Sequence, residues 1–278
     1  MNWKKFMEKF DYEKSVWGRG EASFSWSDPT AFRIWRSFYW LKDVAVDGKV
    51  LEVGCGAGQF ISAFKREKSS WNCYGVDISE KAISEARKKN DGVRYDLVKD
   101  DNSLPYPDNY FSAVLIFDVL EHVNSPENVL REIFRVLKPG GLFYCFVPCE
   151  TDKLSFWRYL RFSFWNDLTR LYAGHINRWS RKEWLDIFLK TGFKIKYKNY
   201  SEHFLGQFVG VFAFYLMHRY ARKKGVDQIN NEHFFSQSFS VGRSYGYLKK
   251  IINILIYWES RIFRRVPSPN FHVLLEKK

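Results

Sequence analysis

The sequence has little of what marks a secreted, metal-binding or membrane-spanning protein. Its 278 residues include only four cysteines, none at metal-ligand spacing, so we expect reduced thiols in or near the core and no bound metal. They are Cys55, Cys73, Cys145 and Cys149. The first 14 residues contain no apolar secretory region, which predicts no signal peptide and a cytoplasmic location. The uncharged run from Phe204 to Met217 has 14 residues, fewer than the roughly 20 that a membrane-spanning helix needs.

Acidic residues are scarce in the second half of the chain. The net charge is +13, but residues 1–50 carry 9 Lys or Arg and 7 Asp or Glu, residues 51–150 carry 12 and 15, and residues 151–278 carry 23 and 9. The excess positive charge suits an acidic partner, whether anionic lipid, a phosphate-bearing substrate or nucleic acid. A general contribution to solubility is the alternative.

A glycine-rich turn follows the first apolar run. Val50 to Val53 predicts a strand, Gly54, Gly56 and Gly58 predict a tight turn, and Gln59 to Glu67 predicts an amphipathic helix. This order brings the backbone N–H groups of a helix N-terminus close to a ligand. The dinucleotide fingerprint needs a third glycine three residues after the second, and none stands there, so a nicotinamide enzyme is disfavoured.

Two more strands and an acid follow at regular spacing. Asn72 to Asp77 predicts a second strand, and Asp77 stands 19 residues after Gly58, about where a carboxylate would accept both hydroxyls of a ribose. Val93 to Lys99 predicts a third strand, and the apolar run Phe111 to Phe117 predicts a fourth.

The order of these segments resembles that of a known enzyme family. From Glu52 the turn has the E-x-G-x-G-x-G form of the first motif of class I S-adenosylmethionine (SAM)-dependent methyltransferases. Lys99 to Asp108 resembles the G-D-A-x-x-L-P-F-x-D segment of the subgroup that includes the quinone and sterol methyltransferases. The likeness continues through Asp118 to Val123 and Val129 to Gly141, and it spans about residues 48–148.

The resemblance implies that SAM is the cofactor and that the turn and the strand ends hold it. Asp77 would accept hydrogen bonds from the ribose, and either Asp100 or Asp101 would accept one from the adenine amino group. The implied cofactor-binding residues are Glu52, Gly54, Gly56, Gly58, Asp77, Ile78, Asp100, Asp101 and Phe117.

The resemblance also implies an α/β fold: a Rossmann-like seven-stranded mixed sheet with strand seven antiparallel, helices on both faces and aromatic helical cap additions. Leu142 to Val147, Lys194 to Tyr200 and Phe271 to Glu276 are the expected last three strands. A chain of this size can bury one large core, which predicts a single domain over 1–278. Its expected parts are an N-terminal helical cap (1–45), the SAM-binding core (46–150), a substrate lid (151–178) and a C-terminal sheet half (179–278) with a helical insertion (204–265).

Local signals predict several helix ends. Asp28-Pro29 opens an aromatic helix that runs to about Lys42, and Ser125 is an N-cap followed by Pro126 at the first helical position. Pro139-Gly140-Gly141 is expected to end that second helix. Ser180 and Glu183 form a capping box at the start of a third helix.

Rings and arginines interleave from Phe156 to Trp165, after the fifth strand, where an open parallel sheet binds its ligands. We expect this segment to form the substrate lid, with Trp157, Arg161 and Trp165 contacting the acceptor. Ordinary helix packing, with arginine stems lying over the rings, is the alternative.

Three residues are candidates for catalysis. His175 lies in a loop where the family often has a histidine, and it could be a general base or a hydrogen-bond donor to the substrate. His122 and Glu121 follow the fourth strand. Each has a structural alternative, because loop histidines are often only exposed and Glu121 could hold the cofactor loop by accepting backbone N–H groups.

Together these features predict SAM-dependent methyl transfer to a small or amphiphilic acceptor, such as a quinone, a lipid or a lipid-linked glycan, at oxygen or carbon. The alternatives are an RNA methyltransferase that uses the basic half for phosphate contacts and a non-catalytic SAM-fold binding module. No N/D-P-P-Y motif follows the fourth strand, which argues against amino methylation of DNA bases.

Apolar residues recur at helical spacing late in the chain: Leu248, Ile251, Ile252, Leu255, Trp258 and Ile262. Basic residues fall on the opposite side: Lys249, Lys250, Arg261, Arg264 and Arg265. This pattern predicts a basic amphipathic helix, which either lies on an anionic membrane surface or forms a solvent-backed cap of the catalytic domain.

Overall fold

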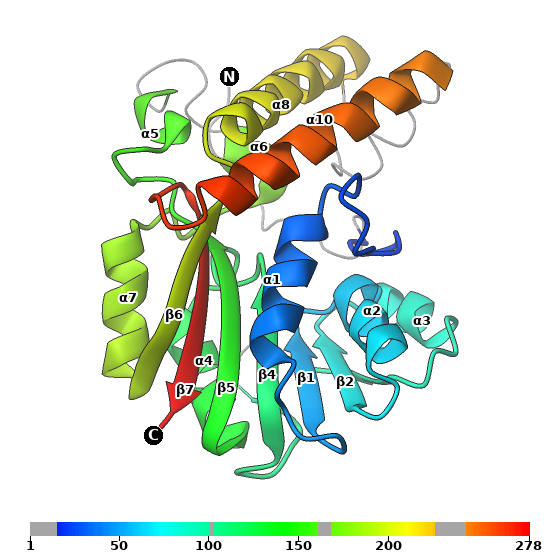
Figure 1. The fold of residues 1–278 in the computed structure, drawn as a ribbon, viewed down its shortest axis with the longest axis vertical. Helices are drawn as coiled ribbons and strands as arrows, with labels where there is room; N and C mark the ends of the chain where they lie inside the picture. The colour runs from blue at the N-terminus through cyan, green and yellow to red at the C-terminus, as the bar shows by residue number, and fades with distance from the viewer. Residues whose placement is uncertain (1–15, 100–102, 161–167, 226–242) are drawn as a thin grey trace.

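A seven-stranded sheet is the centre of the molecule. The computed structural model describes residues 16–99, 103–160, 168–225 and 243–278. The sheet has the strand order β3-β2-β1-β4-β5-β7-β6 (Figure 1). Its strands are β1 (Lys49–Val53), β2 (Asn72–Asp77), β3 (Arg94–Leu97), β4 (Phe111–Phe117), β5 (Leu137–Pro148), β6 (Phe193–Ser201) and β7 (Asn270–Lys277).

The direction of the strands confirms the predicted fold class. Strands β1 to β5 pair in parallel, whereas β7 pairs antiparallel with both β5 and β6. Because β1 lies between β2 and β4, the strand order reverses at this point, and a crevice is expected outside the carboxyl ends of β1 and β4.

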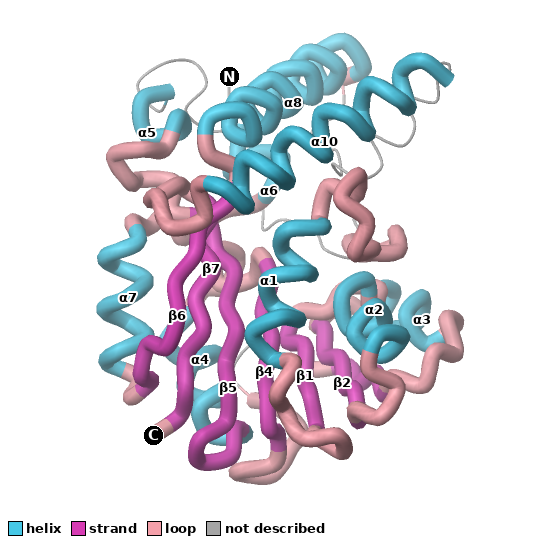
Figure 2. The backbone as a smooth tube through the Cα atoms, viewed as in Figure 1, coloured by secondary structure: helices cyan, strands magenta, loops and turns pink. Residues whose placement is uncertain are grey.

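Helices cover both faces of the sheet. The helices α1 (Ala31–Leu41), α2 (Gln59–Glu67) and α3 (Glu80–Arg87) lie on one face, and α4 (Pro126–Val136) and α7 (Arg181–Lys190) lie on the other (Figure 2). A hydrophobic core lies on each side of the sheet, and alternate residues of β4 pack into one or the other. This is because successive side chains of a strand point to opposite faces. Val114 and Ile116 pack with α4 and α7, whereas Ala113 and Leu115 pack with α1 and α2.

Within the described residues, further helices lie beyond the carboxyl ends of the parallel strands β1 to β5 (Figures 1 and 2). They are α5 (Phe156–Leu160), α6 (Leu168–Ala173), α8 (Phe204–Lys224) and α10 (Arg243–Ile262). The Glu259 carboxylate of α10 accepts the backbone N–H groups of Phe204, Leu205 and Gly206 at 3.0, 2.7 and 3.2 Å, so it caps the N-terminus of α8. Within the described ranges, no helix has the length and apolar character needed to cross a bilayer.

Some predicted boundaries are wrong. β5 begins at Leu137 rather than Leu142, because Leu137 pairs with Phe111 before the register shifts and Leu142 pairs with Ala113. The Pro139-Gly140-Gly141 turn therefore lies inside the assigned strand, as an irregularity, and the helix before it ends at Val136. Helix α1 starts two residues after Pro29, because the Asp28 carboxylate accepts the Thr30 N–H at 2.7 Å and holds the preceding turn.

Two serines at helix starts differ in what their side chains do. Ser180 and Glu183 form the predicted capping box of α7, whereas Ser125 occupies the N-cap position of α4 without a side-chain cap bond. We expect Ser180→Ala to lower the free energy of unfolding by about 1 kcal/mol and the matched Ser125→Ala to leave it nearly unchanged. Urea unfolding of both variants measures this, and equal losses would contradict the assigned caps.

Candidate active site

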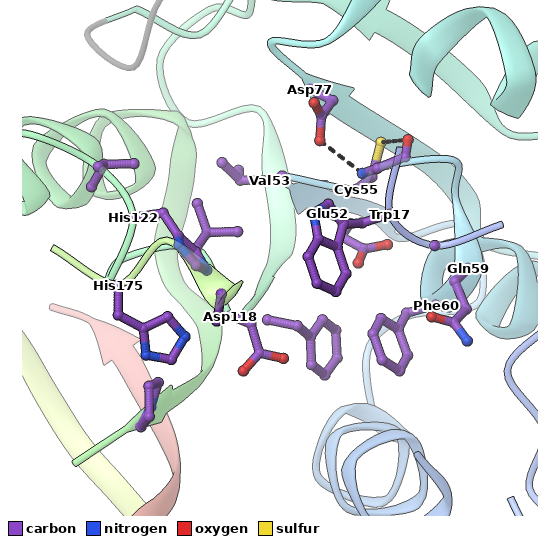
Figure 3. Close-up of a pocket in the computed structure, with 18 of the residues that line it drawn as sticks. Trp17, Glu52, Val53, Cys55, Gln59, Phe60, Asp77, Asp118, His122 and His175 are labelled. Carbon is purple, nitrogen blue, oxygen red and sulfur yellow. Dashed lines mark hydrogen bonds between the residues drawn. The ribbon is translucent and has the colours of Figure 1, made fainter. Parts of the chain in front are cut away.

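A cavity of about 580 Å³ opens at the carboxyl ends of β1 and β4. The glycine turn and the end of β2 line one side, and loops after β4, β5 and α6 line the other. Trp17, Glu52 and Asp77 therefore lie opposite His122 and His175, with Asp118 between the two groups (Figure 3).

The glycine turn is held by close backbone contacts. Gly56 has a φ of 52°, and a Cβ there would lie 2.5 Å from the Trp17 carbonyl oxygen, so only glycine fits. Asp77 accepts the Gly56 N–H at 2.8 Å, and Glu52 accepts the Ile61 N–H at 2.8 Å. Burial raises the pKa of Glu52 to about 8. The turn thus presents ordered backbone at the cavity wall.

Most of the predicted cofactor residues meet at this cavity. Those that line it are Glu52, Gly54, Gly56, Asp77, Ile78 and Phe117. Gly58 is not in the lining; a Cβ there would lie 2.5 Å from the hydroxyl of Tyr95. Asp100 and Asp101 lie outside the described residues, but Lys99 and Leu104 on either side of them line the cavity.

The cavity suits both parts of SAM, the nucleoside and the amino acid. The glycine turn offers a wall without side chains at Gly54 and Gly56, and the Asp77 carboxylate offers acceptors at the end of β2. Phe60 and Phe117, stacked with ring centroids 4.2 Å apart, supply an apolar surface. These features fit a nucleoside joined to an amino acid, and no pyrophosphate site is needed.

His175 is paired with a carboxylate that the sequence analysis missed. The Nδ1 of His175 lies 2.6 Å from a Glu150 carboxylate oxygen, and Arg178 donates to the other oxygen at 2.8 Å. Burial favours the neutral carboxyl, but His175 and Arg178 lower the pKa of Glu150 to about 2. Burial also opposes charge on the imidazole, yet Glu150 raises the pKa of His175 above its usual value. Both residues line the cavity.

His122 and Glu121 lie beside this pair, and burial opposes charge on both. The His122 ring is 5.0 Å from the His175 ring, and burial, followed by the nearby His175, lowers the pKa of His122 to about 3. Burial, with Asp118 adding to it, raises the pKa of Glu121 to about 8. Among the described residues, no backbone N–H of the glycine turn donates to the buried Glu121 carboxylate.

A metal ion is a weaker interpretation of this cluster. Glu121, His122 and His175 each place a ligand atom within 4.8 Å of the others. A metal would need Glu121 deprotonated and His175 neutral, and the raised pKa of each residue opposes this. The Nδ1 of His175 also lies 2.6 Å from Glu150, an arrangement that suits proton transfer.

Arg33 and two carboxylates form a second polar group in the cavity wall. Arg33 of α1 pairs with Asp118, and its other terminal nitrogen lies 3.6 Å from a Glu202 oxygen. Both acids have a positive φ, 50° for Asp118 and 54° for Glu202. Asp adopts this region more often than most residues with a side chain, whereas Glu rarely does. The position of Asp118, Glu150 and Glu202 in the sequence could have marked them as site residues, because each follows a predicted strand within a few residues. Arg33 lies on a distant helix, and nothing in its local sequence marks it.

Part of the predicted lid reaches the cavity. Trp157 of α5 lines it and packs on Phe214 of α8, with ring centroids 5.3 Å apart. Gln207 accepts the Phe156 N–H at 2.7 Å and so joins the same two helices. Arg161 and Trp165, the other two predicted acceptor contacts, lie outside the described residues.

Comparison with known proteins gives the family. The family model described as a methyltransferase domain matches residues 31–198, more than half of the chain. This chain belongs to that methyltransferase family. It is a class I SAM-dependent methyltransferase, with SAM as its methyl donor.

Curated relatives match the cofactor half. A ubiquinone/menaquinone biosynthesis C-methyltransferase of Desulfotalea psychrophila is 34% identical over 118 residues, which is 42% of this chain and 48% of the relative. A sterol 24-C-methyltransferase of Aspergillus fumigatus is 36% identical over 109 residues, 37% of this chain and 29% of the relative. The chain thus covers less than half the length of these relatives.

Solved structures share the fold over most of the chain. The [4+2]-cyclase SpnF has a TM-score of 0.56 at 21% identity and covers 94% of this chain and 83% of its own. A geranyl diphosphate methyltransferase in complex with GPP and sinefungin has a TM-score of 0.54 at 15% identity, with coverage of 88% and 76%. At such identities the likeness shows the fold alone.

The titration of His175 tests the ion pair directly. In Glu150→Gln the negative charge is lost, so the pKa of His175 should fall and its ring should become neutral at a lower pH than in the wild type. NMR titration of the imidazole nitrogens measures this, with His175→Asn to assign the signal. Asp152→Asn, two residues away and paired with Arg181, should leave the titration unchanged. An unaltered His175 curve in Glu150→Gln would contradict the pairing.

Proposed function

We propose that this methyltransferase carries a methyl group to a small or amphiphilic acceptor of the quinone, lipid or lipid-linked glycan type, at an oxygen or carbon. The observation that carries the proposal is the Glu150–His175 pair in the cavity wall. A base there suits an acceptor that becomes nucleophilic only when it loses a proton.

On the cofactor side, the glycine turn and Asp77 bind and orient SAM. Gly54 and Gly56 would let the backbone approach the amino-acid part, and Asp77, which holds the Gly56 N–H, would accept from the ribose hydroxyls. SAM supplies an activated methyl on a sulfonium. The protein therefore mainly has to align the acceptor and exclude water.

On the acceptor side, His175 in its neutral form takes the proton, and Glu150 stabilises the imidazolium that results. Trp157 and Phe214 provide an apolar wall for the body of the acceptor. Arg33 and Asp118 offer polar contacts from α1 and the end of β4. Relatives named for ubiquinone/menaquinone and sterol methylation support an acceptor with an apolar body.

The role of Asp77 predicts a loss of cofactor affinity. Asp77→Ala should weaken SAM binding by about 1.5 to 3 kcal/mol, because the charged acceptor for the ribose hydroxyls is lost. Calorimetry measures this for SAM and for its demethylated product. Asp47→Ala, outside the cavity lining, is the control and should bind as the wild type does. Wild-type affinity in Asp77→Ala would remove Asp77 from the binding site.

The role of His175 as general base predicts a slower methyl transfer when it is replaced and a dependence of the rate on pH. His175→Asn should slow methyl transfer by about 100-fold or more, and His218→Asn, a histidine outside the cavity lining, should not. The wild-type rate should rise as pH passes upward through the pKa of His175. Labelled SAM incubated with cell extract, followed by separation of lipid, soluble metabolite and RNA pools, identifies the acceptor and provides the assay. Label in RNA alone would replace this proposal by the RNA alternative, and SAM binding without label in any pool would favour a binding module.

A further inference from the structure

The outer side of α8 carries an exposed row of aromatic side chains. Phe204, Phe208 and Phe212 are 71%, 59% and 52% exposed. Their four-residue spacing places them on one face of the helix. The opposite face, with Met217 and Ala221, is buried. Phe204 contacts Phe156 and Phe212 contacts Tyr215, yet each of the three rings stays more than half exposed. Such a row is more than the scattered apolar exposure of an ordinary surface.

Helix α10 exposes its apolar side as well. Four aliphatic side chains at helical spacing are 52–66% exposed. They are Leu248, Ile251, Leu255 and Ile262. The helix packs on the domain through a mixed side: Tyr257 is buried in an apolar cluster with Ala31 and Phe32. Beside it, Asn253 donates to the Ser27 carbonyl at 2.8 Å, and Ser260 accepts the Glu202 N–H at 2.9 Å. Four aliphatic side chains of the predicted apolar side are thus left exposed, and Arg264 and Arg265 lie beyond the end of the helix at Ile262.

The two helices lie side by side and are strongly basic (Figures 1 and 2). Each carries four Lys or Arg, and together they have one acid, Glu259. That acid caps α8, and because eight cations stand against it, the two helices remain strongly positive. The exposed cations include Lys223 and Lys224 on α8 and Lys249 and Lys250 on α10.

From these observations we infer that the α8–α10 face docks on an anionic lipid leaflet, with the phenylalanine and aliphatic rows in the headgroup region and the lysines against the lipid phosphates. Apolar burial and electrostatic attraction add in such a contact. An anionic leaflet has a negative headgroup layer above an apolar layer. The α8–α10 face has exposed apolar rows flanked by cations, and the single acid of the two described helices caps α8.

Docking on this face would place the cavity beside the membrane. Gly206, Gln207, Gly210 and Phe214 line the cavity from α8, the helix that carries the exposed phenylalanines. An amphiphilic acceptor held in the leaflet would then lie one helix away from the Glu150–His175 pair. This inference goes beyond the proposed reaction, since docking does not require methyl transfer.

Vesicle sedimentation of the full chain tests the inference. Vesicles containing phosphatidylglycerol should pellet the wild type, and phosphatidylcholine vesicles should pellet much less of it. Leu255→Ser should weaken binding several-fold, whereas Leu189→Ser on α7 should not; both leucines are 52% exposed on helices. Lys249→Glu/Lys250→Glu should weaken binding by more than about tenfold, and Lys182→Glu/Lys190→Glu on α7 should have a smaller effect.

Each variant is first shown to bind SAM as the wild type does, so that a loss of docking is not a loss of folding. Pelleting that is independent of vesicles, or equal losses for the α7 and α10 variants, would overturn the inference. So would sedimentation velocity showing a dimer that Leu255→Ser dissociates, because a second copy would then cover the face. If the wild type bound vesicles but not SAM, the proposed function would fail while the docking surface stood.

Discussion

The glycine turn after β1 is the constraint on which the rest of the site depends. It joins three segments that are distant in sequence: the N–H groups of Gly54 and Cys55 donate to the Val76 carbonyl at 2.8 and 2.9 Å, and the Ala57 N–H donates to the Trp17 carbonyl at 2.8 Å. Because these bonds hold β1, β2 and the N-terminal segment at one point, they also determine where Asp77 meets the cavity. A side chain on Gly56 would force the Trp17 backbone away and open this junction.

Burial determines which polar groups at the site carry charge. Glu121 and His122 lie where desolvation favours their neutral forms, whereas Glu150 keeps its charge because His175 and Arg178 surround it. Burial thus opposes charge on Glu121 and His122, whereas the hydrogen-bonded Glu150–His175 pair is stabilised in its ionic form. Such a division gives one imidazole a raised pKa without adding net charge to the cavity.

The fold by itself does not determine the reaction. A [4+2]-cyclase shares this architecture as closely as a geranyl diphosphate methyltransferase does. What is particular to this chain lies outside the sheet: Trp157, Phe214 and the ion pair around Glu150 at the cavity, and two basic helices between β6 and β7 that expose apolar side chains. Helix α8 belongs to both sets, since one face lines the cavity and the other carries exposed phenylalanines.

Local and periodic signals were enough to predict the sheet, the glycine turn and Asp77 at the end of β2, because these depend on neighbours within a few residues or on an ordered series of motifs. The strand β5 was placed five residues late, since its start depends on pairing with Phe111 rather than on the Pro-Gly-Gly turn. Glu150 and Arg33 were missed because their partners, His175 and Asp118, are 25 and 85 residues away in sequence. For the helix from Arg243 to Ile262, the sequence determined that one side is apolar. Only tertiary packing decided that this side faces outward, because Asn253, Tyr257 and Ser260 already satisfy the contact with the domain.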